Sequence, residues 1–210
     1  MRLAAALAVL MAPPAFAEDL TVFPERIEAS CRGGRAKLYD ECSDQRALFA
    51  RALEDANRQD KVLLVSYGAE WCIWCHVFDA YLDGQSGSFT HTYASPEDIQ
   101  RDTATLYERP EGDVTEEAEA LRAYAAEHFV LVHLDTRYAP GADEAVASTG
   151  QDPALIRGLP FIFAVTAEGR YAMAFDGDGI ETRREGWDWF RGYDRVLMLA
   201  MLERMFEAAR

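Results

Sequence analysis

Two cysteines separated by two residues, Cys72 and Cys75, are the residues whose type and spacing most directly suggest chemistry. They follow an apolar run at 62–67 that predicts a buried strand, and they precede a helical-looking segment at 77–82. A thiol in the first turn of a helix lies beside unpaired backbone N–H groups and the positive end of the dipole, which favour the thiolate. The second thiol lies about one turn further on, close enough to form a disulfide with the first. The first hypothesis is therefore reversible thiol–disulfide exchange.

The cysteines are followed directly by His76, which leaves other chemistries open. Cys-x-x-Cys-His is the attachment motif for c-type haem, in which both thiols form thioethers and the histidine is an axial ligand. Two thiols and one imidazole could also hold a soft metal in a binding or docking module. In a redox pair, His76 shares the helix face of Cys72 and would lower the pKa of that thiol as a cation or hydrogen-bond donor. An ordinary surface histidine is the alternative.

The bulk composition fits one globular domain with an acidic surface. Half of the 210 residues are hydrophobic and 11% are aromatic, which provides a core and argues against disorder. The formal net charge of −15 argues against nucleic acid and against an anionic membrane surface as partners. Composition thus argues against nucleic acid and anionic membranes as partners, and it does not indicate which reaction the protein carries out.

Residues 1–17 have the pattern of an export signal. Arg2 supplies a positive charge, residues 3–11 form a short apolar region, and 15–17 give the small-x-small cleavage pattern. Prolines interrupt the segment well before the roughly 20 apolar residues that a membrane span needs. We expect cleavage after Ala17 and release into a bacterial periplasm, where disulfides persist. An uncleaved anchor or a buried N-terminal helix is the alternative.

The other two cysteines, Cys31 and Cys42, lie in an N-terminal extension, residues 18–43, whose sequence predicts irregular structure up to Cys42. Four cysteines in an exported chain allow three pairings. If Cys72 pairs with Cys75, a Cys31–Cys42 disulfide is what remains, and closing that loop would stabilise the fold by about 3 kcal/mol. We expect a structural disulfide. A second redox relay or a metal site is the alternative, although no further ligands lie nearby at zinc-finger spacing.

The mature chain alternates predicted helices and strands. Continuous apolar runs predict buried strands, and apolar residues at helical spacing predict helices. The predicted elements are a helix from Ser43 to about Gln59, a strand at 62–67, a cysteine-bearing helix ending near Asp83–Gly84, strands at 128–134, 161–165 and 171–175, and a helix at 187–209.

Residues 84–127 form an insert between the cysteine-bearing helix and the next strand. Ser95-Pro96-Glu97-Asp98 has the cap, the proline and the acids of a helix start, and Pro110 would end that helix. Asp113-Val114-Thr115-Glu116 resembles a capping box for a second helix, with apolar residues at helical spacing up to Phe129. We therefore predict a helical insert.

Two motifs in this order resemble thioredoxins. Ala69-Glu70-Trp71-Cys72 with Cys75 matches the thioredoxin active-site pattern, and Ile156-Arg157-Gly158-Leu159-Pro160 is similar to the segment that carries a cis-proline in that family. The resemblance covers residues 44–83 and 128–210. It implies an α/β thioredoxin fold, a central mixed sheet flanked by helices, here with a helical insert after the Cys-x-x-Cys helix.

The resemblance also implies a role for each matching residue. Cys72 is expected to be the exposed nucleophile and Cys75 the more buried resolving thiol, with Trp71 packed beside the pair. Pro160 is expected to be the cis-proline that faces the disulfide. That bond would expose the backbone of Leu159 for strand-like pairing with a substrate peptide.

The sequence departs from the thioredoxin pattern at three positions near the pair. Ser66 stands where thioredoxins carry a buried aspartate that helps move the proton of the resolving thiol, so that aid is missing or is replaced by a water. Ile73 and Trp74 stand between the cysteines in place of Gly-Pro or a histidine-containing pair. The ending Trp74-Cys75-His76 is similar to a divergent set of thioredoxin-like proteins. Reductase, oxidase and isomerase all stay open.

These features predict a thioredoxin-like domain at 44–210 that acts as an exported thiol–disulfide oxidoreductase on protein thiols and disulfides. No metal and no dissociable cofactor are expected, because the redox group is the Cys72–Cys75 disulfide itself. We expect a monomer that binds no nucleic acid and is not inserted in the membrane after signal cleavage. A membrane redox partner would recharge it.

Overall fold

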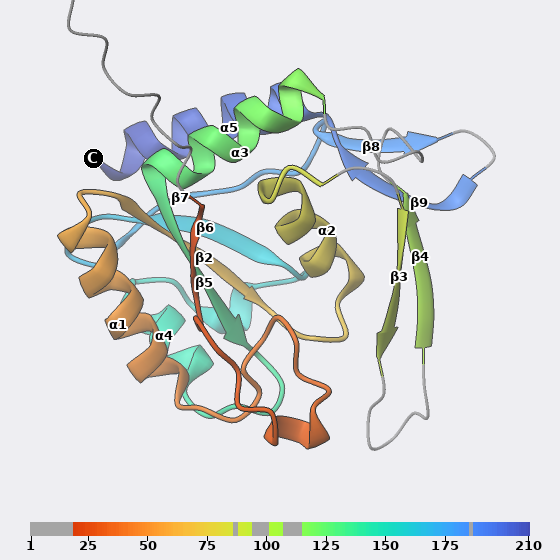
Figure 1. The fold of residues 1–210 in the computed structure, drawn as a ribbon. Coiled ribbons are helices and arrows are strands. Elements are labelled where there is room, and N and C mark those ends of the chain that lie inside the picture. The colour runs from red at the N-terminus through yellow and green to blue at the C-terminus, as the bar shows by residue number, and fades with distance from the viewer. Residues whose placement is uncertain (1–18, 86–87, 94–100, 107–114, 185–186) are drawn as a thin grey trace, which may run out of the picture.

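The computed structural model describes residues 19–85, 88–93, 101–106, 115–184 and 187–210. Its centre is a five-stranded sheet in the order β1-β5-β2-β6-β7 (Figure 1). The strands are β1 (Thr21–Phe23), β2 (Val62–Gly68), β5 (Phe129–Asp135), β6 (Phe161–Val165) and β7 (Tyr171–Ala174). β1, β5 and β2 run parallel, β6 is antiparallel to β2, and β7 is antiparallel to β6, so the sheet is mixed.

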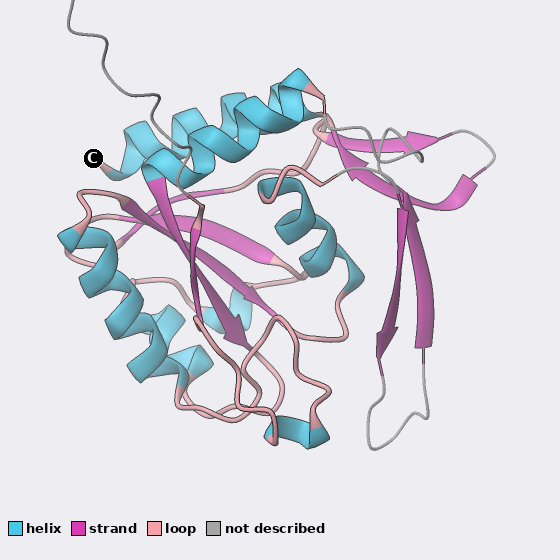
Figure 2. Cartoon of the chain, viewed as in Figure 1, coloured by secondary structure: helices cyan, strands magenta, loops and turns pink. Residues whose placement is uncertain are grey.

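Helices cover both faces of this sheet (Figure 2). α1 (Gln45–Arg58) and α4 (Ala142–Ser148) pack on one face, and α2 (Ile73–Leu82), α3 (Glu116–His128) and α5 (Arg195–Ala209) pack on the other. Short 3-10 helices, η1 (Cys31–Gly33) and η2 (Pro153–Leu155), lie in connections. None of the helices in the described ranges has both the length and the apolar character that a bilayer crossing requires.

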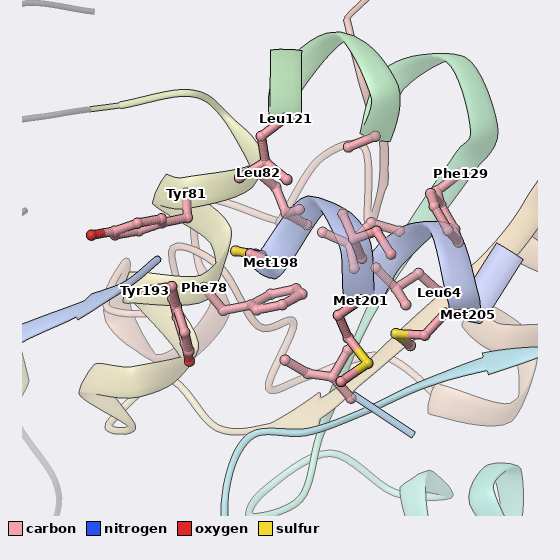
Figure 3. Packing of buried hydrophobic residues seen from close by; sticks show 14 of the residues in the cluster. Leu64, Phe78, Tyr81, Leu82, Leu121, Phe129, Tyr193, Met198, Met201 and Met205 are labelled. Atoms are coloured by element: carbon pink, nitrogen blue, oxygen red, sulfur yellow. The ribbon is translucent and has the colours of Figure 1, made fainter. Parts of the chain in front are cut away.

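The alternation of side chains along the central strands explains why both faces are covered. All residues of β2 are buried, and successive side chains of a strand point to opposite faces. Leu64 packs with Phe78 of α2 and Met201 of α5 (Figure 3). Leu63 and Val65 pack in the opposite cluster, against α1 and α4. The apolar run at 62–67 therefore forms a strand buried on both faces, as predicted.

The strand order and connections are those of the thioredoxin fold, so the predicted fold class is confirmed. The predicted strands at 62–67, 128–134, 161–165 and 171–175 and the helix ending near Gln59 are confirmed to within one or two residues. α1 is capped by Asp44 in place of Ser43, because the Asp44 carboxylate accepts the N–H groups of Arg46 and Ala47. The cysteine-bearing helix ends at Leu82 with Asp83 as its C-cap, close to the predicted end near Asp83–Gly84.

The insert is only partly helical, and the first of its two predicted helices is wrong. Residues 101–106 form a strand, β4 (Arg101–Leu106), which pairs antiparallel with β3 (Ser88–Tyr93); residues 94–100 lie outside the described ranges. Alternating threonines suit a pleated strand better than a helix, and over 101–106 strand pairing replaces the predicted helix. The helix-start signal itself, at 95–98, lies outside the described ranges. Figure 1 shows this hairpin standing beside α2, away from the central sheet.

The second predicted helix of the insert is confirmed as α3. Its cap is Thr115, whose hydroxyl accepts the backbone N–H of Ala118. Acidic residues occupy its first turn, where they complement the helix dipole. The helix packs on α2 and α5 and so covers part of the sheet face that carries the cysteine helix.

The predicted C-terminal helix over 187–209 is wrong at its beginning. Residues 187–193 form β9 (Trp187–Tyr193), which pairs antiparallel with β8 (Glu181–Arg184), and α5 begins only at Arg195. The aromatic side chains in this stretch favour a strand, and Asp194 then caps the helix by accepting the N–H of Leu197. The predicted apolar periodicity therefore holds for α5 alone.

Two further elements were missing from the predicted order. Residues 18–42 were predicted to be irregular, yet Thr21–Phe23 forms the edge strand β1 of the central sheet. The polar stretch after β5 contains α4, which buries Ala142, Ala145 and Val146. Both elements are short, and such elements carry little periodic signal.

Replacing Asp194 tests where α5 begins. Asp194→Ala removes the cap and is expected to lower the free energy of unfolding by about 1 kcal/mol, whereas Asp194→Asn keeps a capping group and should behave like wild type. Chemical denaturation measures both. A stabilised Asp194→Ala variant would contradict the boundary, because alanine is the better residue inside a continuous helix.

Candidate active site

The cysteine pair lies at the beginning of α2. Cys72 is the N-cap residue, with extended backbone, and its Sγ atom accepts the backbone N–H of Cys75 at 3.2 Å. The two residues form a disulfide, with their Cα atoms 5.3 Å apart. A sulfur in this position faces the unpaired N–H groups of the first turn, which stabilise a negative charge. The local structure therefore favours a thiolate at Cys72 when the pair is reduced.

Both cysteines are buried in the disulfide form, and the exposed residue beside them is Trp71, at 39%. Cys72 is 4% exposed and Cys75 is fully buried, so the prediction of an exposed Cys72 is wrong for this form, although Cys75 is the deeper of the two, as expected. Ile73 and Trp74 are half-buried and pack against the core beneath α2, and the Trp74 ring lies 5.5 Å from the ring of Tyr193. The dipeptide between the cysteines therefore packs the first turn of α2 against the hydrophobic core.

His76 turns towards the residues that precede Cys72. Its Nε2 atom lies 2.8 Å from the backbone oxygen of Glu70 and 3.6 Å from the Glu70 carboxylate. Glu70 is itself buried. The imidazole thus links the first turn of α2 to the loop between β2 and α2.

Glu70 also binds the N-terminal extension. Its Oε2 atom accepts the backbone N–H groups of Leu38 and Tyr39 at 2.9 and 3.0 Å. These contacts bring the extension under the cysteine helix, and Tyr39 forms one buried cluster with Cys72 and Cys75. Glu70 was recognised in the sequence as part of the active-site motif, but its contacts with the extension were not predicted. Tyr39 was missed altogether, because it is distant in the sequence and reaches the pair only through the fold.

Ser66, which stands in place of the buried aspartate, is fully buried and bonds to Tyr39. The two hydroxyl oxygens are 2.8 Å apart. On the neighbouring strand, Ser66 pairs with His133, whose Nε2 atom lies 3.0 Å from Asp79 of α2. Burial raises the pKa of Tyr39 well above its ordinary value of 10.0, so its phenol stays protonated. The neutral hydroxyl groups of Ser66 and Tyr39 therefore lie where thioredoxins have a buried carboxylate.

The segment that carries the predicted cis-proline borders the cysteine pair. The Leu159–Pro160 peptide bond is cis, and Leu159 packs against the cluster of Tyr39, Cys72 and Cys75. A surface groove runs beside Trp71 along this segment. Its lining residues are Tyr67, Trp71, Thr136, Pro153, Ile156, Arg157, Gly158 and Leu159.

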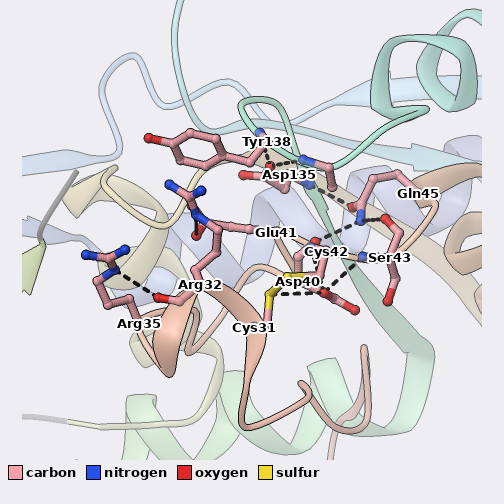
Figure 4. Close-up of a disulfide and its surroundings, with 11 residues drawn as sticks. Cys31, Arg32, Arg35, Asp40, Glu41, Cys42, Ser43, Gln45, Asp135 and Tyr138 are labelled. Carbon is pink, nitrogen blue, oxygen red and sulfur yellow. Dashed lines mark hydrogen bonds and ion pairs between the residues drawn. A yellow bond between two sulfur atoms is a disulfide. The ribbon is translucent and has the colours of Figure 1, made fainter. Parts of the chain in front are cut away.

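The other cysteine pair forms a disulfide as expected. The Cα atoms of Cys31 and Cys42 are 5.9 Å apart. Asp40 lies inside the closed loop and accepts the N–H groups of Cys42 and Ser43 at 3.0 and 3.2 Å (Figure 4). Within the described ranges these residues bring two sulfurs and a carboxylate together, but both sulfurs are committed to the disulfide.

Buried charge surrounds this disulfide loop. The Glu41 carboxylate pairs with Arg32 at 3.5 Å, and the Arg32 guanidinium lies over the ring of Tyr138 (Figure 4). Burial, followed by the negative charge of Asp135, raises the pKa of Glu41 from 4.5 to about 7. Burial also raises the pKa of Asp135, against the backbone N–H groups that its carboxylate accepts. The extension is therefore held by a cluster of titratable groups.

The haem and soft-metal alternatives require sulfur and imidazole groups that can reach an added group. Cys75 is fully buried next to Tyr39, and Nε2 of His76 already lies against the Glu70 carbonyl. This arrangement favours exchange between the two sulfurs over ligation by the three side chains.

Comparison with known proteins shows a distant likeness among solved structures. No protein-family model matches the chain, and neither does any curated protein. Among solved structures, the C-terminal domain of DsbD from Neisseria meningitidis, in its oxidised form, is similar over 78% of this chain and 97% of its own length. The sequence identity is 17% and the TM-score 0.37. Because this likeness is so distant, the assignment of a thioredoxin fold rests on strand order and connections.

Replacing Glu41 tests its burial. Since the folded-state pKa of about 7 lies above the ordinary 4.5, the folded protein keeps a proton that the unfolded chain has released. The stabilisation from Glu41 is therefore complete below pH 4.5 and lost as the pH rises towards 7. Glu41→Gln should remove this loss, which is on the order of 2 kcal/mol.

The measurement is the free energy of unfolding of wild type and variant at several pH values across this window. Glu28→Gln, a change at an exposed carboxylate of the same extension, is the matched control and should keep the wild-type pH dependence. Equal pH dependence in wild type and Glu41→Gln would contradict the assignment.

Proposed function

We propose that this protein is an exported thiol–disulfide oxidoreductase that exchanges electrons with protein thiols and disulfides through Cys72 and Cys75. The observation that carries the proposal is the position of the pair. It lies at the first turn of α2 and beside Leu159 of the Leu159–Pro160 segment, in a sheet with thioredoxin strand order. The alternative, a metal-binding or docking module on the same fold, is less well supported because both sulfurs face each other.

The proposed reaction proceeds in two exchanges. The Cys72 thiolate attacks one sulfur of a substrate disulfide, forms a mixed disulfide and releases the other substrate sulfur as a thiolate. The Cys75 thiolate then attacks the sulfur of Cys72, the Cys72–Cys75 bond forms, and the second substrate thiolate leaves. The substrate gains the two electrons that the cysteine pair loses. The reverse sequence oxidises a substrate dithiol.

The groove beside Trp71 supports a protein substrate. Trp71 presents an exposed aromatic surface, and residues of the loop at 153–159 line the same groove. An extended peptide lying there would bring its own cysteine next to Cys72, and the backbone of Leu159 is proposed to pair with it. His76 is proposed to support Cys72 by fixing the first turn through Glu70.

The setting of the reaction is proposed from the sequence. Cleavage after Ala17 would release the protein into the periplasm, where a reductase is recharged by a membrane electron donor and an oxidase by a membrane acceptor. The acidic net charge of −15 supports a protein partner over nucleic acid. No dissociable cofactor is needed, and we propose that the protein acts as a monomer.

Serine replacement of each active-site cysteine tests the proposal. Cys72→Ser should reduce insulin reduction and dithiol oxidation to the level without protein, because the attacking sulfur is gone. Cys75→Ser is the matched control: it keeps the attack and should accumulate a mixed disulfide, detected by mass spectrometry after acid quenching. Full activity in Cys72→Ser would disprove the assignment.

A further inference from the structure

The hydroxyl of Tyr39 is a polar group buried beside the resolving cysteine. The side chain is fully buried, in one cluster with Cys72 and Cys75. In the disulfide form its oxygen is hydrogen-bonded to the hydroxyl of Ser66 at 2.8 Å. During exchange the sulfur of Cys75 becomes a thiolate, and a buried hydroxyl next to it can stabilise the negative charge by donating a hydrogen bond.

Gly68 shows how close the two groups are. A Cβ atom at this position would lie 2.5 Å from the Tyr39 hydroxyl oxygen and 2.7 Å from the Cys75 sulfur. Both distances are shorter than real contacts, so a side chain here would displace one group or the other. The phenol oxygen and the sulfur therefore flank the same point of β2, and only glycine allows this approach.

Tyr39 is held in this position from several sides. Glu70 accepts the backbone N–H of Tyr39, and the ring edge packs against His133 with centroids 5.0 Å apart. The Cys31–Cys42 disulfide closes the loop in which Tyr39 lies. The hydroxyl is thus fixed beside α2, with freedom left chiefly in the rotation of its O–H bond.

We propose that, when the pair is reduced, the Tyr39 hydroxyl donates a hydrogen bond to the sulfur of Cys75 and thereby takes part in the step that resolves the mixed disulfide. This inference rests on the proposed function. The Tyr39 hydroxyl would stabilise the thiolate of Cys75. The sulfur of Cys72 already accepts a hydrogen bond from a backbone amide of the first helical turn.

The chemistry of the resolving step explains why such a donor is useful. The Cys75 thiolate attacks the Cys72 sulfur, the new disulfide bond forms, and the substrate sulfur leaves with the electron pair of the broken bond. Before the attack, the negative charge on Cys75 is buried, and burial disfavours a thiolate. A hydrogen bond from Tyr39 stabilises that charge, and Ser66 can donate to the phenol oxygen in turn. After the bond forms, the phenol bonds to Ser66 again.

Burial and the negatively charged groups around Tyr39 keep its phenol protonated, so that it can donate a hydrogen bond to the sulfur of Cys75. Buried or half-buried groups face it from several elements, and the negative ones add to the burial that keeps the phenol protonated. These groups are Asp79 of α2, Glu70 of the loop after β2, and His133 and Asp135 of β5. The phenol therefore acts by donating a hydrogen bond and does not have to lose its proton.

The first test measures the thiol pKa of Cys75 directly. In a Cys72→Ser background Cys75 is left without its partner, and its thiolate is followed by ultraviolet absorbance during a pH titration. Adding Tyr39→Phe should raise the pKa of Cys75 by about one unit, the effect of removing one hydrogen bond to a charged group. Tyr193→Phe, a buried tyrosine that packs on the other flank of α2, should leave it unchanged.

The second test follows the reaction itself. Reduced protein is mixed with glutathione disulfide, and formation and decay of the Cys72 mixed disulfide are measured by quenched mass spectrometry across pH. Tyr39→Phe should leave the formation rate unchanged and shift the midpoint of the decay rate about one pH unit higher. At neutral pH the decay should slow only about threefold, because a more basic thiolate is also a better nucleophile.

The outcomes separate the inference from the proposed function. An unreactive wild-type protein would overturn both. A reactive wild type, with Tyr39→Phe unchanged in the pKa of Cys75 and in the decay midpoint, would overturn the inference alone. If Tyr39→Phe fails to unfold cooperatively, Ser66→Ala serves in its place: it removes the second hydroxyl and should raise the pKa of Cys75 in the same direction. No shift there would overturn the inference equally.

Discussion

One carboxylate, that of Glu70, joins the N-terminal extension to the cysteine helix. It accepts the backbone N–H groups of Leu38 and Tyr39, while the backbone carbonyl of the same residue bonds to His76. Hydrogen bonds to a charged group stabilise by about 1.5–3 kcal/mol each, and losing this acceptor would leave buried N–H groups unpaired. The position of Tyr39 beneath the disulfide and that of the first turn of α2 both depend on this residue.

The two active-site sulfurs are consequently supported in different ways. Cys72 lies at the helix N-terminus, where backbone amides stabilise a thiolate without help from a side chain. Cys75 lies one turn deeper, fully buried in one cluster with Tyr39, whose hydroxyl bonds to that of Ser66. The disulfide-closed extension thus contributes to the site itself, because it places the Tyr39 phenol beside Cys75. The Cys31–Cys42 disulfide closes the loop that presents this residue.

Four of the five strands of the central sheet and the helix that carries the cysteines could be predicted from the sequence, because long apolar runs and a helix-start motif are local signals. Prediction failed where pairing or packing overrides local preference. Residues 101–106 of the first helix predicted for the insert pair as strand β4, and the aromatic stretch from Trp187 pairs as β9, so that α5 begins only after its cap Asp194. At the site, Ser66 was recognised as a departure, but its partner Tyr39 was not. The contact joins segments 27 residues apart and is made by tertiary packing, which has no sequence period.

The reduction potential of the Cys72–Cys75 pair decides whether it is a redox-active pair or a structural disulfide. The protein would be equilibrated in thiol–disulfide buffers of graded potential, and the free thiols at each cysteine would be counted by alkylation and mass spectrometry. We predict reversible two-electron reduction of Cys72–Cys75 between about −270 and −120 mV, with Cys31–Cys42 still oxidised. A Cys72–Cys75 disulfide that stays intact below about −300 mV, as structural disulfides do, would contradict the description.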